Sequence, residues 1–440
     1  MTTVDERMDD FERWLSIGLG RAIRWVDAHG DAEHREFLSR TCLVETAYDH
    51  QVEGSRAGYI HELLTRTPDP AFYRDLVLGA VRAVEGNGCD DEFLLKMAWQ
   101  FTDGENDEFR EVLYEKANSD LDAWELALQQ IVVLDGIPGL LKVARERSST
   151  GPYRGWWPVE DLIGFRDGRD GAEERLAKAR RDCPELDVML AEGPDEEPAT
   201  RAEIEPGMPW PEIRSLLSVP ESLQPYQMRF WARGADEAEL TLAAEELIAC
   251  PEDDPRRIRR LIQAFSDVSF PGPLDRILSW ARGIRPYPES AGRPESPEFL
   301  AHSAAKALAR TVGPEVRAFG LELVERGLRL DVAAECLRRN FEDGDWEILA
   351  DLARRKLDPD ETHWLTKAID SAFTDCEEPD PEAVPALLAC YERNPCSFCR
   401  EMIVRDLDAA DAVPDWMREE CRDDACDELR DWAESGEWKD

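Results

Sequence analysis

The chain has 440 residues, 42% of them hydrophobic, and its 95 acidic and 53 basic residues give a formal net charge of −42. The 14 Trp and 15 Phe provide enough large apolar side chains for folded cores, which argues against a disordered chain. The charge argues against a surface that follows a nucleic-acid backbone, because such a surface must be basic.

The acidic excess is concentrated toward the C-terminus, since residues 371–440 contain 21 Asp and Glu but 7 Arg and Lys. This acidic end could be an electrostatic face for a basic partner. It could equally provide solubility or reflect adaptation of the source organism to salt, and both interpretations stay open.

The N-terminal residues, the apolar runs and the cysteines indicate the location and redox state of the chain. The N-terminal residues MTTVDERMDD lack the basic region of a signal peptide, and we expect no run of about 18 apolar residues that could span a membrane. The 11 Cys are odd in number and scattered, which favours reduced thiols. We therefore expect a cytoplasmic protein.

The first 192 residues read as helices with a loose spacing, and no alternating run predicts a strand. We treat residues 1–192 as an irregular helical region. The expected helices cover residues 5–28, 31–48, 55–66, 70–85, 90–103, 107–117, 121–132, 137–146 and 171–191.

A Pro-rich segment follows, and residues 193–234 are expected to be a linker or a long loop because proline interrupts helices. Residues 235–440 then show helix pairs whose first helices start near 297, 330, 361 and 396. Spacings of this size predict an all-α solenoid, in which each helix pair buries its apolar face against the next pair.

One pair carries a family resemblance. The stretch PEFLAHSAAKALARTVGPEVRAFGLELV resembles a HEAT repeat through its small-residue core at Ala304, Ala305, Ala307 and Leu308. Two further tracts, AYDHQVEGSRAGY and YERNPCSFCR, resemble parts of uncharacterised bacterial HEAT-repeat proteins. The resemblance implies a stack of helix pairs and names no activity.

The first candidate site is a polar corner at residues 48–61. Ser55 and Arg56 at a helix start could hold an anion, and Glu53 or His50 could then transfer a proton. The alternative is a helix cap in which Ser55 accepts from the next amides and Arg56 pairs locally. The candidate binding residues here are His50, Gln51, Glu53, Ser55, Arg56 and His61.

Metal sites have weak support. Four of the six His lie in residues 29–61, but no two have the i, i+4 spacing that puts both rings on one helix face. Cys396, Cys399, Cys421 and Cys426 superficially match a zinc site. In one continuous helix, however, Cys421 and Cys426 would point to different faces, so buried thiols are the favoured interpretation.

Arginine runs form the last candidate, with Arg256, Arg257 and Arg260 in one helix. On a concave face they would resemble the phosphate-binding surface of helical-repeat DNA glycosylases, whereas the charge favours local pairing with carboxylates. The tract GWWP at 155–158 is expected to be a packed corner under a loop.

We therefore expect a non-catalytic scaffold or adaptor that binds a protein partner, with a basic protein as one suitable partner and with no cofactor. One alternative is an acidic mimic of nucleic acid that occupies a nucleic-acid-binding protein. A third, less favoured, is an enzyme similar to helical-repeat DNA glycosylases. No P-loop, GxGxxG, GxSxG or HExxH motif occurs in the sequence.

Overall fold

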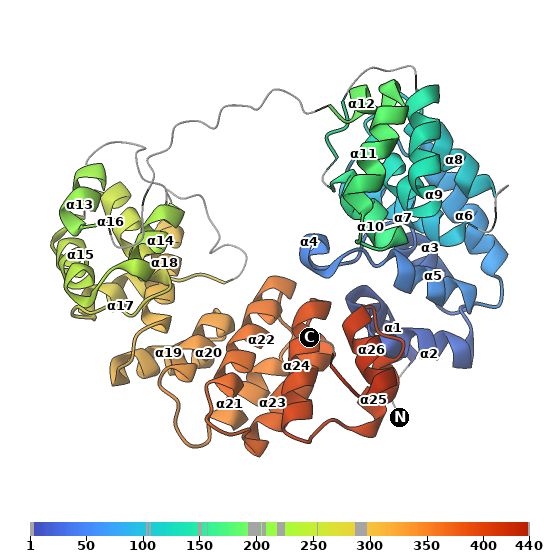
Figure 1. Cartoon of the computed structure of the whole chain (residues 1–440). Coiled ribbons are helices and arrows are strands. Elements are labelled where there is room, and N and C mark those ends of the chain that lie inside the picture. Colours follow the sequence, from blue (N-terminus) through green and yellow to red (C-terminus); the bar gives the residue numbers. More distant parts are fainter. Residues whose placement is uncertain are drawn as a thin grey trace. The chain divides into compact units, whose positions relative to one another are not determined.

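The computed structural model describes residues 4–102, 104, 107–147, 152–155, 157–191, 204, 208–217, 225–252, 254–286 and 297–438. Every regular element in these residues is a helix, so the predicted all-α class is confirmed (Figure 1). The chain forms two compact units, and each is described by itself. Unit 1 comprises residues 1–196, 396–398 and 414–440, and unit 2 comprises residues 197–395 and 399–413.

Unit 1 is built from helices of both ends of the chain. Its helices are α1 (Val4–Ile17), α2 (Gly20–His29), α3 (Arg35–Thr41), α4 (His50–Glu53), α5 (Ala57–Thr65), α6 (Pro70–Ala83), α7 (Cys89–Phe101), α8 (Glu108–Ala117), α9 (Trp124–Glu146), α10 (Val159–Asp167), α11 (Ala172–Asp182), α12 (Pro184–Met189), α25 (Asp415–Cys421) and α26 (Asp427–Ser435).

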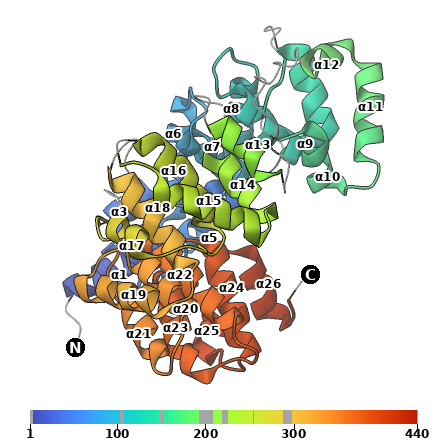
Figure 2. The ribbon, with the colours of Figure 1, turned by 90° about the vertical axis from the view of Figure 1, so that its left-hand side faces the viewer.

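Alternate helices of unit 1 pack on one another. Helix α7 contacts both α5 and α9, while α6 contacts α8, so the loosely spaced N-terminal sequence still gives two rows of helices. Helices α9, α10 and α11 then pack in succession and lie side by side in both views (Figures 1 and 2). Fully buried side chains such as Phe93, Phe109 and Leu128 fill the core between the rows.

Helix α9 bears on the membrane question. It contains a window whose length and mean hydropathy would allow it to cross a membrane, although Gln130 and Asp135 interrupt the apolar run, and 56% of that window is buried inside the protein. At Gly136 the backbone has φ 60° and ψ −146°, which breaks the helix into two segments. A buried, interrupted helix is typical of a protein core rather than of a membrane span.

The C-terminal helices complete unit 1 against its N-terminal helices. Helix α25 packs on α2, and the amide of Ala425 donates to the carbonyl of Gly18 at 2.9 Å. A Cβ atom on Gly20 would lie 2.0 Å from the carbonyl oxygen of Glu420, so only glycine permits this approach. The expected division into 1–192 and 235–440 differs from these units, because residues 414–440 belong with the N-terminal ones.

Unit 2 consists of helices that follow one another along the chain. They are α13 (Trp210–Leu217), α14 (Pro225–Gly234), α15 (Glu237–Ala249), α16 (Pro255–Gln263), α17 (Asp275–Ala281), α18 (Pro297–Ala309), α19 (Pro314–Arg326), α20 (Leu330–Arg338), α21 (Asp345–Ala353), α22 (Pro359–Thr374), α23 (Val384–Arg393) and α24 (Ser397–Ala409), whose first two residues fall in unit 1.

The linker expected at 193–234 does not extend over helices α13 and α14. Trp210 and Trp231 are both buried there, with ring centroids 5.2 Å apart, and the apolar burial outweighs the proline-rich composition. The part of this linker at 193–203, 205–207 and 218–224 lies outside the described residues.

Even-numbered helices of unit 2 form one continuous row. Helix α14 packs on α16, α16 on α18, α18 on α20 and α20 on α22, while α21 packs on α23 beside this row. The predicted pair starts at 297, 330, 361 and 396 correspond to helix starts at Pro297, Leu330, Pro359 and Ser397.

Asp-Pro pairs open helices in both units. Asp69, Asp254 and Asp358 each accept a backbone N–H of the first helical turn, and each is followed by the first residue of α6, α16 or α22. The aspartate satisfies a free amide, while proline supplies a helical φ and has no amide to satisfy. The expected starts at 70 and near 361 fall at or within two residues of two of these caps.

We predict opposite effects for two helical glycines of unit 1. Gly20→Ala should lower the free energy of unfolding by about 1–3 kcal/mol, because its methyl group would overlap the Glu420 carbonyl. Gly79→Ala, at an exposed position of α6 with nothing within 4 Å, should raise it by about 0.5–1 kcal/mol. Denaturant unfolding measures both, and equal effects would contradict the close approach.

Candidate functional site

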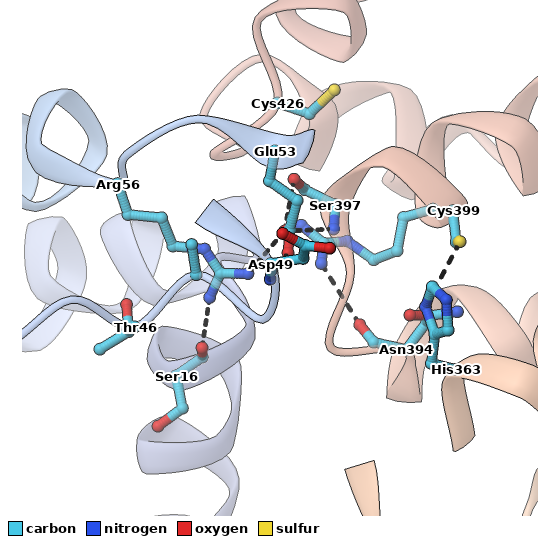
Figure 3. Close-up of polar contacts among 12 residues, drawn as sticks. Ser16, Thr46, Asp49, Glu53, Arg56, His363, Asn394, Ser397, Cys399 and Cys426 are labelled. Carbon is cyan, nitrogen blue, oxygen red and sulfur yellow. Dashed lines mark hydrogen bonds and ion pairs between the residues drawn. The ribbon is translucent and has the colours of Figure 1, made fainter. Parts of the chain in front are cut away.

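The 48–61 corner contains a buried ion pair of unit 1. Glu53 ends α4, and its Oε1 accepts the Asp49 amide at 2.7 Å (Figure 3). Its Oε2 accepts both the amide (2.7 Å) and the hydroxyl (2.8 Å) of Ser397, and it lies 3.1 Å from Arg56 Nη2. The side chains of Glu53 and Arg56 are 1% and 3% exposed.

These contacts determine the charge of Glu53. Burial alone would raise the pKa of this carboxyl, but the Arg56 charge and the hydrogen bonds from Ser397 and Asp49 outweigh it and lower the pKa. Arg56 also donates to the carbonyl of Ser16 (Figure 3), and Ser55 Oγ accepts the Ala57 amide at 3.2 Å. This part of the corner therefore acts as a cap and a charged tie between segments.

The remaining corner residues lie apart from that pair. His50 is half-buried, and its Nε2 is 3.5 Å from the Sγ of the exposed Cys89. Gln51 is exposed. His61 is half-buried and packs edge-on against Phe101 at a centroid distance of 4.6 Å, where burial lowers its pKa. The six residues do not converge on one open cavity.

The arginines of α16 belong to unit 2. Arg257 pairs with Glu246, which also pairs with Arg214 at 2.8 Å, and the hydrogen bond to Glu246 raises the pKa of Arg257. Arg256 is exposed, and Arg260 is half-buried. One member of the run is thus held by a carboxylate, as the local-pairing interpretation predicts.

The four C-terminal cysteines are buried and unpaired by disulfides. In unit 2 the Sγ of Cys399 lies 3.6 Å from His363 Nδ1 (Figure 3), and in unit 1 the thiol of Cys426 donates to Glu428 at 3.3 Å. Cys396 and Cys421 fall in unit 1, so the four thiols of the zinc hypothesis are not gathered within either unit.

The helix that we assumed to join Cys421 and Cys426 is interrupted. Helix α25 ends at Cys421, and α26 begins at Asp427. Between them, the carboxylate of the fully buried Asp424 accepts the Cys426 amide at 3.0 Å. An aspartate that bonds an amide two residues ahead forms a turn without glycine or proline, which the sequence argument did not consider.

A second buried polar cluster lies in the even-numbered row of unit 2. We call Arg329, Asp331, His302 and Glu361 the Arg329 cluster. Arg329, 2% exposed, makes a bidentate pair with Asp331 at 2.9 and 2.6 Å and lies 2.6 Å from His302 Nδ1. Burial and the Arg329 charge lower the pKa of His302 to about 3, so the ring is neutral and can accept.

The backbone at this cluster is unusual. Arg329 has φ 44°, a left-handed conformation that disfavours side chains other than glycine, and it precedes the first residue of α20. Glu361 of α22 accepts the next amide, Leu330 N, at 2.7 Å, and burial raises its pKa. The cluster therefore ties α18, α20 and α22 together at one point.

An exposed tryptophan lies on the same row. Trp364 of α22 is 46% exposed, and the ammonium groups of Lys306 and Lys367 lie 5.8 and 5.2 Å from its ring centroid. Two of the eight lysines of the chain thus flank this one exposed ring. A large aromatic side chain flanked by cations is a typical anchor of a protein interface.

Helices α22 and α24 also share a pair of buried acids in unit 2. Asp370 and Asp406 are 7% and 8% exposed, and the two carboxyl groups interact with each other. Burial first, and then the charge of Asp370, raise the pKa of Asp406 to about 8. Burial also raises the pKa of Asp370, although the positive charges of Lys367 and Arg338 partly oppose this rise. The charge of Asp370 in turn helps to raise the pKa of Cys390. One proton is shared between the two acids.

No family model, curated protein or solved structure matches the chain. The sequence did not single out Arg329, Trp364 or the acid pair. A positive φ at an arginine has no sequence signature, and the exposure of Trp364 depends on which face of α22 is covered.

Glu53→Gln should lower the free energy of unfolding by about 3–5 kcal/mol at pH 7, because it removes the carboxylate charge that pairs with the buried Arg56. Since the folded-state pKa of Glu53 is lowered, its contribution is present above the ordinary value of 4.5 and is lost as the pH falls through the folded value. Denaturant unfolding at pH 7 and pH 4 should show that the difference in free energy of unfolding between Glu53→Gln and wild type becomes smaller in acid.

The exposed control Gln51→Ala should change the free energy of unfolding by less than about 0.5 kcal/mol. An equally small effect of Glu53→Gln would contradict a stabilising role of the Glu53–Arg56 pair.

Asp406→Asn should flatten the pH dependence of stability. The raised folded pKa means that the folded chain keeps a proton which the unfolded chain loses, so stability falls as the pH rises from the ordinary value of 3.8 to about 8. We expect Asp406→Asn to remove up to about 1.4 kcal/mol of this fall per pH unit. Denaturant unfolding between pH 5 and pH 9 measures the change of the free energy of unfolding with pH, and exposed Asp343→Asn is the control. If Asp406→Asn showed the same pH dependence as the wild type and Asp343→Asn, the retained proton would be refuted.

Proposed function

We propose that the protein is a non-catalytic helical-repeat scaffold that binds a protein partner along the even-numbered row of unit 2. The carrying observation is that α14, α16, α18, α20 and α22 pack in succession, with an exposed tryptophan on the row. A row of stacked helices presents an extended surface, as in α-solenoids, and the HEAT-like stretch at α18 and α19 supports this arrangement.

The polar groups favour a structural rather than a catalytic use. Glu53 with Arg56, and Arg329 with Asp331, bond to each other in the interior of their units. A general acid or base must instead reach a substrate in an accessible cavity. A scaffold of this kind would work without a cofactor, and we place it in the cytoplasm.

Trp364 would be the anchor of the partner interface. Its ring supplies apolar area at low entropic cost, while Lys306 and Lys367 favour a partner with carboxylates beside an apolar pocket. This local charge differs from the acidic chain as a whole, which was expected to suit a basic partner.

Trp364→Ala should reduce recovery of the partner at least tenfold, because buried aromatic anchors dominate interface energies. The measurement is quantitative affinity capture from cells of the source organism with wild-type protein, Trp364→Ala and the control Trp416→Ala, in which a comparably exposed tryptophan (44%) of unit 1 is removed. Any protein lost with the first variant but kept with the second is the predicted partner. If every captured protein is retained by Trp364→Ala, the proposed interface is wrong.

The purified complex should then be measured against salt. Between about 50 and 300 mM, a packed interface should lose little affinity, whereas an acidic mimic of nucleic acid should lose its basic partner steeply. A steep loss would favour the mimic.

A further inference from the structure

Unit 1 contains a pocket that the scaffold role does not use. It has a volume of about 630 Å³ and lies among α7, α9, α10 and the residues that flank α10. We call it the α9–α10 pocket. It is lined by Lys96, Trp99, Gln129, Gln130, Val133, Trp157, Asp161, Leu162, Phe165 and Arg169. Its size is within the range of pockets for small organic ligands.

The walls of the pocket are aromatic and exposed. Trp157 is 51% and Phe165 is 73% exposed, an unusual state for large apolar side chains, and Trp99 is half-buried between helix rows. Tyr153, whose hydroxyl donates to the carbonyl of Trp157 at 2.7 Å, holds one wall in place. The GWWP tract is thus an open aromatic wall at Trp157, and the expectation of a packed corner is wrong for that residue.

The floor of the pocket carries two amides. Gln129 is 3% exposed, and its Nε2 donates to Tyr153 Oη at 3.2 Å, which leaves its Oε1 available as an acceptor. Gln130 is 5% exposed, and its side-chain amide makes no hydrogen bond to any residue that the structure describes. The amide atoms of Gln130 stay accessible to water within the pocket, so a ligand there can bond to them in place of water.

We propose that the α9–α10 pocket binds a purine-type heteroaromatic ring, stacked on its aromatic walls and read at its edge by the amide of Gln130. A glutamine amide offers a donor and an acceptor side by side, the pattern that pairs with the N6/N7 edge of adenine. Aromatic side chains bind the faces of such rings by stacking. Aliphatic ligands would leave the amide unsatisfied, so they fit the floor less well.

Charged residues on the rim of the pocket distinguish a ligand with a phosphate from a neutral ligand. Arg169 is exposed, and its guanidinium makes no hydrogen bond or ion pair within the described residues. A phosphate on the ligand would satisfy it, whereas Asp161 on the same rim would repel one. A free nucleotide and a free nucleoside therefore share the ring chemistry and differ at Arg169.

The test is calorimetric titration of the full chain with adenosine, adenosine monophosphate and guanosine. Adenosine should bind saturably with one site per chain, and guanosine, which has a carbonyl in place of the N6 amine, should bind at least tenfold more weakly. Tighter binding of the monophosphate, abolished by Arg169→Gln, identifies the nucleotide as the ligand form, and equal binding identifies the nucleoside. If none of the three binds up to 1 mM, the proposal is overturned.

Two variants separate a binding role from a structural one. Gln130→Met keeps the length of the side chain but removes the amide, so adenosine binding should weaken about 5- to 150-fold while the thermal midpoint stays the same or rises. A fall in the midpoint with unchanged binding would make Gln130 a structural residue and overturn the proposal. Phe165→Ala should weaken binding at least fivefold without loss of stability, and Val312→Ala, 71% exposed in unit 2, should change neither.

Discussion

Buried pairing of arginine with carboxylate is the interaction on which much of this structure depends. The chain carries a large acidic excess, and some of its carboxylates lie in the interior between helices. In the corner Arg56 holds Glu53, in the even-numbered row Arg329 holds Asp331, and Arg317 holds the buried Asp345 at 2.6 Å. Each pair is planar and bidentate or is supported by backbone amides, which is what allows a charge to lie away from water.

The same pairing explains how few basic residues can neutralise the buried carboxylates. Of 53 basic residues only 8 are lysine, and the guanidinium group of arginine can bond several oxygens in one plane. The buried acids Asp370 and Asp406 use another solution, since the pKa of Asp406 is raised to about 8 and the pair keeps a proton at neutral pH. Hydrogen-bond donors to buried carboxylates therefore determine the interior of the protein as much as apolar packing does.

Much of the helical pattern could be predicted from the sequence because its signals are local. The apolar spacing along the sequence located the helices at 297, 330, 361 and 396 to within two residues. Three breaks were missed. Gly18 turns the chain at φ 77°, Asp424 makes a turn through its side chain, and the helix expected at 171–191 is divided at Cys183. Helix α10 was missed because only Val159, Ile163 and Gly164 of its nine residues are buried, too thin a stripe to show a period.

The sites were harder to predict because their partners are distant in sequence. Glu53 and Arg56 were singled out as neighbours, but Ser397, which bonds the same carboxylate, lies 344 positions away. The pocket is assembled from α7, α9 and α10, and none of these segments carries a motif by itself. Sequence spacing describes one helix at a time, whereas a pocket is a property of several.

Unit 1 closes only when residues 414–438 dock against its first helices. During synthesis the N-terminal helices leave the ribosome first and must wait for the whole of unit 2 to be made before α25 can cover Gly20. The face of α2 that α25 later covers stays accessible throughout that interval. A chain truncated before α25 would therefore keep an unfinished N-terminal unit.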